Sequence, residues 1–368
     1  MYVTPTEQAE LWLRLSLVRG AGPMLGHRLV ESVGGVEALW RGGIESWSEI
    51  DGVGPALLKS LQASSADSIT PVMNQCEADQ IRVICPDDEF WPKALIGIDD
   101  APLILFVKGD VKSLNSEKML AVVGARRASR EGSLIARRWS SNFSDHGITT
   151  ISGMAYGIDA AVHGGSLDGL SPTIAVLGCG LSAVNETQQA QVEAICREGC
   201  VISEYLPDQS ARPEQFPRRN RIIAALAQAT LVIEADLRSG SLITARCAAN
   251  YGREVLAVPG SVLSSSHAGC HQLIQDGAGL AHDPLSVMQQ LGWQGGRSKA
   301  NSKLKQFQPG SENEAKIVEI LRRESLHLDE LTETCGLTLP ELSPILLGLE
   351  LQGVIERLPG SRYQLSAE

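Results

Sequence analysis

Residues 215–248 decide the fold, and they read QFPRRNRIIAALAQATLVIEADLRSGSLITARCA. Apolar residues at helical spacing, among them Ile222, Ile223 and Leu226, predict a helix over 220–228. The short apolar run at 231–234 predicts a strand buried on both faces, and a second helix is expected over 241–251. A helix, a buried strand and another helix in succession are typical of an α/β protein with a parallel sheet.

The same stretch carries side chains suited to a nucleic acid strand. An aromatic ring, three arginines and an asparagine precede the first helical pattern, and two serines flank a glycine where the second helix begins. A helix N-terminus attracts anions through its unpaired N–H groups and its dipole, while an aromatic ring can stack on an exposed base. The stretch therefore predicts a site for a phosphate chain with exposed bases. The candidate residues are Phe216, Arg218, Arg219, Asn220, Arg221, Ser239, Gly240 and Ser241.

Strand and helix patterns alternate from residue 119 to residue 285. This alternation predicts a parallel, doubly wound sheet. Two further strands are expected at 81–85 and 103–108, in a connector that precedes the sheet. The expected sheet strands are 120–124, 148–152, 173–177, 200–203, 231–234 and 255–258, and the expected helices are 131–145, 157–167, 188–198, 220–228 and 241–251.

Three glycine-containing turns directly follow expected strands, at residues 124–129, 152–159 and 178–181. Because a parallel sheet binds ligands beyond the carboxyl ends of its strands, these turns should meet on one face. Arg126, Arg127 and Gly153 belong to them, so we expect this face to bind phosphate. The sequence has neither the G-x-x-x-x-G-K-[ST] of P-loop ATPases nor a full G-x-G-x-x-G with its distant acidic residue, which argues against nucleotide cofactors.

The charge of the chain is unevenly distributed. The net charge is −11, which by itself argues against a nucleic-acid protein. Residues 126–138, however, hold five arginines and one acidic residue, and residues 212–221 hold four arginines and one acidic residue. A basic cleft on an acidic body is compatible with nucleic acid.

The remaining composition indicates a cytoplasmic protein. No run of about 18 uncharged apolar residues predicts a membrane span, and the N-terminus lacks the basic region of a signal peptide. The eight cysteines are scattered without metal-ligand spacing, so we expect reduced thiols and no metal or cofactor.

Residues 1–65 are predicted to form a helical domain of the helix-hairpin-helix or SAM-like type. Two similar turns, RGAGP from Arg19 and DGVGP from Asp51, each precede an apolar helical pattern. The backbone N–H groups of such turns can hold a phosphate, and such modules also serve as packing or protein-contact units. The segment has five basic and seven acidic residues, so both uses stay open.

Residues 66–292 are assigned to the sheet domain, residues 293–311 to a flexible linker and residues 312–368 to a small tail domain. Three helical patterns and a hairpin with a Pro-Gly turn predict a winged helix in the tail. This fold often binds DNA. Residues 303–368 nevertheless hold seven basic and eleven acidic residues, so we favour a protein contact or a structural role.

Several candidates also have a purely structural interpretation. Phe216 either stacks on a base or packs in the core, and Asn220 either reads a base or caps a helix. Arg219 and Arg221 either bind phosphate or pair with the acidic residues at 204, 234 and 236, and Ser239 either donates to phosphate or only caps its helix.

Asp159 and His163 lie four residues apart, on one face of an expected helix. The pair invites a role in general acid–base catalysis. Because no nucleophile or metal-ligand set accompanies them, we interpret them as a structural pair.

The central region resembles the DNA-processing protein A family, also called DprA or Smf. The matching strings are spread in order over residues 119–282, and the helical head and winged-helix tail fit the family as well. The strings are VVGAR from Val122, SGMAYGIDAAVH from Ser152, IAVLGCG from Ile174, ISE from Ile202, FPRRNRII from Phe216, SGSLITA from Ser239, REVLAVPG from Arg253 and GCHQLIQDGA from Gly269.

The resemblance implies an extended Rossmann fold that binds single-stranded DNA. It also implies a homodimer that contacts the RecA recombinase, loads it onto incoming strands and supports natural transformation. The family's DNA pocket maps onto Arg126, Phe216, Arg219, Asn220, Arg221, Ser239, Gly240 and Ser241.

The chain departs from the family pattern at three places. Ala125 stands where the family usually has serine, so one hydroxyl is missing, and Tyr156 stands where the family usually has arginine. The loop at 181–187 is shorter than in the family and lacks its Tyr-Pro pair, so the contribution of that loop is open.

We therefore expect a non-enzymatic protein that protects incoming single-stranded DNA and loads RecA onto it. The alternative is a nucleotide-processing enzyme of the phosphoribohydrolase type on a similar fold. Those enzymes use a PGGxGTxxE-type loop with a catalytic glutamate, and the nearest string here, RSGSLIT from Arg238, lacks a glutamate at the needed spacing.

Overall fold

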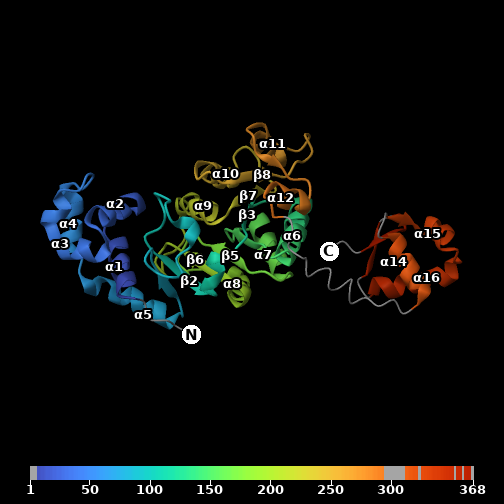
Figure 1. Cartoon of the computed structure of the whole chain (residues 1–368), viewed down its shortest axis with the longest axis horizontal. Coiled ribbons are helices and arrows are strands. Elements are labelled where there is room, and N and C mark those ends of the chain that lie inside the picture. Colours follow the sequence, from blue (N-terminus) through green and yellow to red (C-terminus); the bar gives the residue numbers. More distant parts are fainter. Residues whose placement is uncertain (1–5, 294–310, 322–324, 352–353, 359, 366–368) are drawn as a thin grey trace. The chain divides into compact units, whose positions relative to one another are not determined.

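The structure is a computed structural model that describes residues 6–293, 311–321, 325–351, 354–358 and 360–365 (Figure 1). The chain divides into two compact units, Met1–Gly296 and Arg297–Glu368, and each is described by itself. Residues 294–310 of the expected linker lie outside the described residues.

The first unit is built on one nine-stranded sheet with the strand order β1-β2-β6-β5-β4-β3-β7-β8-β9. The seven strands from β6 to β9 in this order are parallel, which confirms the predicted doubly wound sheet. The two connector strands extend the same sheet, because β2 pairs antiparallel with β6 and β1 with β2. The strands are β1 (Arg82–Ile84), β2 (Leu105–Gly109), β3 (Met119–Val123), β4 (Thr149–Ser152), β5 (Thr173–Val176), β6 (Cys200–Ser203), β7 (Ala229–Val232), β8 (Glu254–Ala257) and β9 (Gly279–Leu280).

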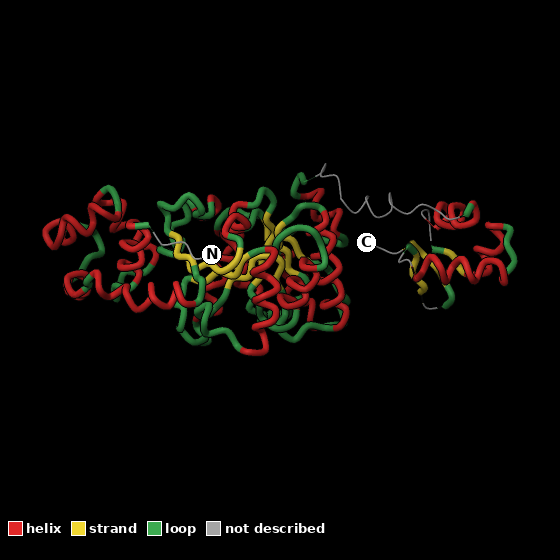
Figure 2. The backbone as a smooth tube through the Cα atoms, turned by 90° about the horizontal axis from the view of Figure 1, so that it is seen from below, coloured by secondary structure: helices red, strands yellow, loops and turns green. Residues whose placement is uncertain are grey.

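Helices cover both faces of this sheet (Figure 2). The chain steps outward from β3 to β6, and then returns through α9 to β7 on the other side of β3. This return creates a switch point between β4, β3 and β7, where the connections diverge. The helices are α6 (Arg130–Asp145), α7 (Ile158–Leu167), α8 (Glu186–Glu198), α9 (Gln215–Leu226), α10 (Ser241–Asn250), α11 (Ala268–Gln275) and α12 (Pro284–Gln290).

Alternate residues of the central strand β3 pack on opposite faces of the sheet. Leu120 and Val122 pack with α6, α7 and α12, whereas Ala121 and Val123 pack with α9, α10 and α11. All four are 3% exposed or less, and burying a large aliphatic side chain stabilises the fold by about 1.5–3 kcal/mol. The strand ends at the switch point are therefore held from both sides.

Helix α9 begins five residues earlier than the pattern at 220–228 predicts. Pro217 lies in its first turn, where the missing N–H of proline costs no helical hydrogen bond. The arginines of the opening stretch consequently lie on the first two turns of a helix, not on a loop that leads into it.

The helical head contains the two expected turns in equivalent settings. Gly20 and Gly52 both have positive φ, and Pro23 and Pro55 each begin the helix that follows. Head side chains share one core with the sheet, including Phe106. The helices are α1 (Glu7–Ser16), α2 (Pro23–Val33), α3 (Val36–Ser48), α4 (Pro55–Ala63) and α5 (Thr70–Ala78).

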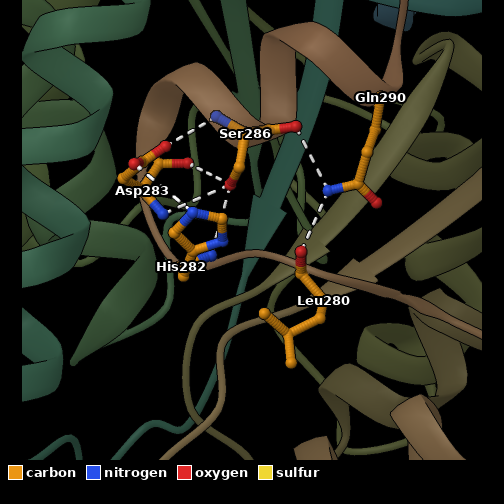
Figure 3. Close-up of polar contacts among 5 residues, drawn as sticks. All are labelled: Leu280, His282, Asp283, Ser286 and Gln290. Carbon is orange, nitrogen blue, oxygen red and sulfur yellow. Dashed lines mark hydrogen bonds and ion pairs between the residues drawn. The ribbon is translucent and has the colours of Figure 1, made fainter.

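The last strand of the sheet is fastened to the helix that follows it (Figure 3). Asp283 and Ser286 form a capping box at the start of α12. Gln290 then donates from its Nε2 to the backbone oxygens of Leu280, at 2.9 Å, and of Ser286, at 3.1 Å. The outer edge at β9 is thus held by α12.

The second unit confirms the predicted winged helix. Three helices surround a small core, and a three-stranded sheet has the order β10-β12-β11. The elements are α14 (Glu312–Leu321), β10 (Leu326–His327), α15 (Leu328–Cys335), α16 (Leu339–Leu351), β11 (Ile355–Leu358) and β12 (Arg362–Leu365).

Candidate nucleic-acid interface

A hollow of about 490 Å³ opens at the carboxyl ends of β3, β4 and β7. These strands are neighbours at the switch point, which is where open parallel sheets bind ligands. Seven predicted site residues line the hollow, namely Arg126, Arg127, Arg219, Asn220, Ser239, Gly240 and Ser241.

The rim of the hollow, which we define as Arg126, Arg127 and Phe216, offers accessible charge. Both arginines are exposed directly after β3. The guanidinium carbon of Arg126 lies 4.9 Å from the centroid of the half-buried Phe216 ring, within cation–π range. That ring also packs against Gly178, where any side chain would collide with it.

The floor of the hollow, which we define as Asp159, Arg219 and Glu234, is buried. Arg219 is 3% exposed, and its guanidinium donates to the backbone oxygens of Gly153, at 2.5 Å, and of Val176. Burial lowers the pKa of Arg219 to about 10, so the group stays charged at neutral pH. Arg219 therefore fastens α9 to the ends of β4 and β5.

The turn after β4 binds a carboxylate of its own. Asp159 Oδ2 accepts from the backbone N–H of Gly153, at 3.1 Å, and of Ala155, at 3.4 Å. Burial raises the pKa of Asp159, and the charge of Arg219 together with these N–H donors opposes that rise. Two donors of the expected phosphate cradle are consequently already occupied.

His163 is also buried, but it bonds elsewhere. Its Nδ1 lies 2.9 Å from Thr173 Oγ1, and burial lowers its pKa to about 3. Asp159 and His163 are thus both structural, each with its own partners.

Glu234 accepts hydrogen bonds at the N-terminus of helix α6, as Asp159 does in the turn after β4. It is 1% exposed, and its Oε2 accepts from the Ser129 hydroxyl at 2.7 Å and from the Ser129 N–H at 3.1 Å. The Ser129 hydroxyl in turn accepts from the N–H of Gly132 in the first turn of α6. An internal anion therefore already complements this helix N-terminus.

The serine turn before α10 remains open to solvent on one side. Ser239 and Ser241 hydroxyls lie 2.7 Å apart, and Gly240 between them is exposed. Asn220 donates from Nδ2 to the Gly240 oxygen at 3.2 Å and accepts from Arg219 Nε at 3.2 Å. Asn220 thus links the serine turn to the floor.

Four predicted residues lie outside the lining of the hollow. Gly153 is buried beneath the Arg219 guanidinium, and Phe216 supports Arg126 from the side. Arg218 is exposed, whereas Arg221 pairs with Glu204, as the structural alternative for Arg221 predicted. Burial raises the pKa of Glu204, and Arg221 opposes the rise.

Comparison with known proteins identifies the family. The sequence profile of DNA recombination-mediator protein A matches residues 82–292, more than half of the chain. The profile of the DprA winged helix domain matches residues 305–361. The chain belongs to the DNA recombination-mediator protein A family.

Relatives in this family cover most of the chain. Protein Smf of Escherichia coli (strain K12) is 36% identical over 289 residues, which is 77% of each chain. Protein Smf of Synechocystis is 31% identical over 98% of this chain and 99% of its own length. DNA processing protein A of Streptococcus pneumoniae has a similar structure, with a TM-score of 0.67 at 31% identity over 78% of this chain and 98% of that chain.

The predicted site residues do not include the acidic part of the site in this family member, because Glu234 and Asp236 were considered only as partners of Arg219 and Arg221. Glu234 and Asp236 both line the hollow, directly beyond the buried strand β7. Their position in the sequence could have identified them, since a polar residue just past a buried parallel strand lies at the end of the sheet where ligands bind. Asp159 also lines the hollow, and its hydrogen bonds to the turn after β4 could not be inferred from its four-residue spacing to His163.

Among the described residues, no three His, Cys, Asp or Glu side chains gather in a way that would hold a metal ion. None of the described helices has the length and apolar character needed to cross a membrane.

Proposed function

We propose that this protein binds and protects incoming single-stranded DNA, and that it loads the RecA recombinase onto that DNA during natural transformation and recombination. In this proposal it acts as a cytoplasmic homodimer and catalyses no reaction. The proposal adds a ligand and a partner to the family's role in DNA recombination.

The rim carries this proposal. Exposed Arg126 and Arg127 can bind successive phosphates, and the Phe216 ring and the open hollow can receive a base. Contacts of this kind tolerate any sequence, because every base has a flat face and every nucleotide a phosphate. The structure of DNA processing protein A from Helicobacter pylori, which is 26% identical with a TM-score of 0.53, is described for its single-stranded DNA binding mode, and it supports the same proposal.

The predicted residues then divide into two roles. Arg126, Arg127 and Arg218 contact phosphates, and Ser239, Gly240 and Ser241 donate hydrogen bonds from the opposite wall. Phe216 also belongs to the contacting group, since its ring receives a base. The other four predicted residues shape the pocket from below or behind: Gly153, Arg219, Asn220 and Arg221.

Each of the three carboxylates that line the hollow, Asp159, Glu234 and Asp236, already accepts a hydrogen bond from within the protein. Glu234 accepts a hydrogen bond from Ser129, and Asp159 accepts one from the backbone of the turn after β4. A phosphoribohydrolase needs a carboxylate available to its substrate. These occupied carboxylates favour the binding proposal.

Fluorescence anisotropy of a labelled oligo-dT tests the proposal against duplex DNA and mononucleotides at two salt concentrations. Tight, salt-sensitive binding of the single strand with weak duplex binding is the expected result. Mononucleotide binding without preference for the oligomer would favour the enzyme alternative. Light scattering of the free protein tests the homodimer, and strand exchange on protein-coated DNA tests RecA loading.

A further inference from the structure

Tyr156 is a large exposed aromatic side chain on the binding edge of the sheet. It is 61% exposed and lies in the turn after β4, next to Ala155, which lines the hollow. Its hydroxyl lies 3.3 Å from Thr187 Oγ1, at the start of α8. Thr187 is itself held by Asn185, which accepts from its N–H at 3.1 Å and caps the helix.

The backbone beneath Tyr156 is fixed in one shape. Met154 has a φ of 56°, a left-handed conformation that a non-glycine residue adopts only where its surroundings enforce it. Gln188 Nε2 donates to the Met154 oxygen at 2.6 Å. The ring is thus presented to solvent from a rigid turn, which lowers the entropy cost of ordering it against a ligand.

The turn that carries Tyr156 packs against the turn that carries Arg126. Gly157 packs so closely on the backbone oxygens of Ala125 and Arg126 that no side chain would fit there. The N–H of Ile158 donates to the Ala125 oxygen at 3.2 Å. The Tyr156 turn and the Arg126 turn are therefore held together by their backbones.

We propose that Tyr156 is a stacking platform for a nucleobase next to the phosphate that Arg126 binds. This inference rests on the proposed function, since it requires that single-stranded DNA occupies the rim. A nucleotide has a base on one side of its sugar and a phosphate on the other, so a ring beside an arginine matches one repeat of the strand. The platform extends the binding site from the hollow toward α8.

Two departures from the family pattern meet at this platform. Tyr156 replaces a usual arginine, and the shortened loop at 181–187 ends at Thr187, whose hydroxyl lies within hydrogen-bond distance of the Tyr156 hydroxyl. Stacking releases no counterions, whereas an arginine–phosphate contact does. The contribution of position 156 to the affinity for the strand should therefore depend little on salt concentration and should require a base.

The test compares oligo-dA with an abasic strand of the same length, using the full chain and its Tyr156→Ala, Tyr156→Phe and Arg126→Ala variants. Leu170→Ala is the matched control, because Leu170 is 62% exposed and precedes the amino-terminal end of β5, whereas the hollow lies at the carboxyl ends of the strands. Tyr156→Ala should weaken oligo-dA binding about fivefold or more, as expected for losing one base–aromatic stack, with an unchanged salt slope. Tyr156→Phe should keep the affinity for oligo-dA.

The abasic strand separates the two contacts. Tyr156→Ala should leave its binding unchanged, whereas Arg126→Ala should weaken the binding of both strands. Equal affinity of Tyr156→Ala and Leu170→Ala for oligo-dA would overturn the platform, as would an equal loss on the abasic strand. Failure of the unaltered protein to bind any single strand would instead overturn the proposed function.

Discussion

The rim and the floor of the hollow contain similar side chains in opposite settings. At the rim, Arg126 is exposed, and its guanidinium carbon lies 4.9 Å from the centroid of the Phe216 ring. At the floor, Arg219 is 3% exposed and donates to backbone oxygens at the ends of two strands. One arginine is available to a ligand, and the other holds the pocket together.

The difference shows that internal anions can satisfy an expected phosphate site before any ligand arrives. Asp159 takes the N–H groups after β4, and Glu234 takes the start of α6. A phosphate entering the floor would meet these carboxylates, whereas at the rim it would meet Arg126 and Arg127. Phosphate should therefore bind at the edge of the hollow, above the buried carboxylates.

The largest expected effect concerns the floor. Arg219→Ala should lower the free energy of unfolding by about 3–5 kcal/mol, because it leaves Asp159 buried without its opposite charge and two strand ends without their donor. Urea unfolding followed by circular dichroism measures this loss. A fully stable variant that has lost oligonucleotide binding would make Arg219 a ligand contact and erase the distinction between floor and rim.

The next effect concerns the rim. Arg126→Ala should weaken oligo-dT binding by about 1.5–3 kcal/mol, the range for hydrogen bonds to charged groups, and should reduce the salt slope by roughly 0.7. Its free energy of unfolding should change by less than about 1 kcal/mol, since it loses only an exposed cation–π contact. Anisotropy titrations at several salt concentrations measure both quantities.

Arg197→Ala is the matched control, because Arg197 is exposed in the last turn of α8, away from the strand ends. The same loss in both variants would indicate diffuse attraction to charge, with no defined phosphate site at the rim.

The sheet was predictable because its signal is local. Short apolar runs such as 119–123 and 200–203 are buried on both faces and separated by helical patterns, so each expected strand lies within two residues of its observed position. The two-residue strand β9 was not expected, because it is too short to give an apolar run. The antiparallel pairing of β1 and β2 was not predictable, because pairing joins residues distant in the sequence. The early start of α9 was missed because Pro217 reads as a helix breaker unless it is placed in the first turn.

The candidate site was predictable as a set of residues but not as an arrangement. The sequence does not show which arginines are buried. The fold buries Arg219 and pairs Arg221 with Glu204. The reason is physical: an arginine on the first turns of α9 points either to solvent or under the strand ends, according to its angular position. Tyr156 looked like a lost charge in the sequence, and its exposure beside Arg126 gives it a different role to test.

A smaller effect concerns the pH dependence of stability, through the buried His163 of α7. The pKa of His163 falls to about 3 in the folded protein, whereas an unfolded histidine titrates near 6.5. The unfolded chain therefore gains a proton first, so the stability from the neutral buried ring is present above pH 6.5 and is lost as the pH falls toward 3.

Between pH 7 and pH 5.5 this linkage should lower the free energy of unfolding by about 1 kcal/mol. His163→Gln should remove that part of the pH dependence, whatever its effect on stability at pH 7. Urea unfolding of both proteins at the two pH values measures it. Parallel pH profiles would mean that the ring is protonated or solvated in the folded state.

The smallest effect concerns Asn220, which links the floor to the serine turn before α10. Its amide accepts from Arg219 Nε and donates to the Gly240 oxygen, both at 3.2 Å. Asn220→Ala should lower the free energy of unfolding by about 1 kcal/mol, the usual net value of such bonds, and should change oligo-dT affinity less than about twofold. The affinity changes little because the amide already has partners on both sides. A large loss of affinity at unchanged stability would instead place Asn220 on a base, and the link between the floor and the serine turn would become part of the ligand site.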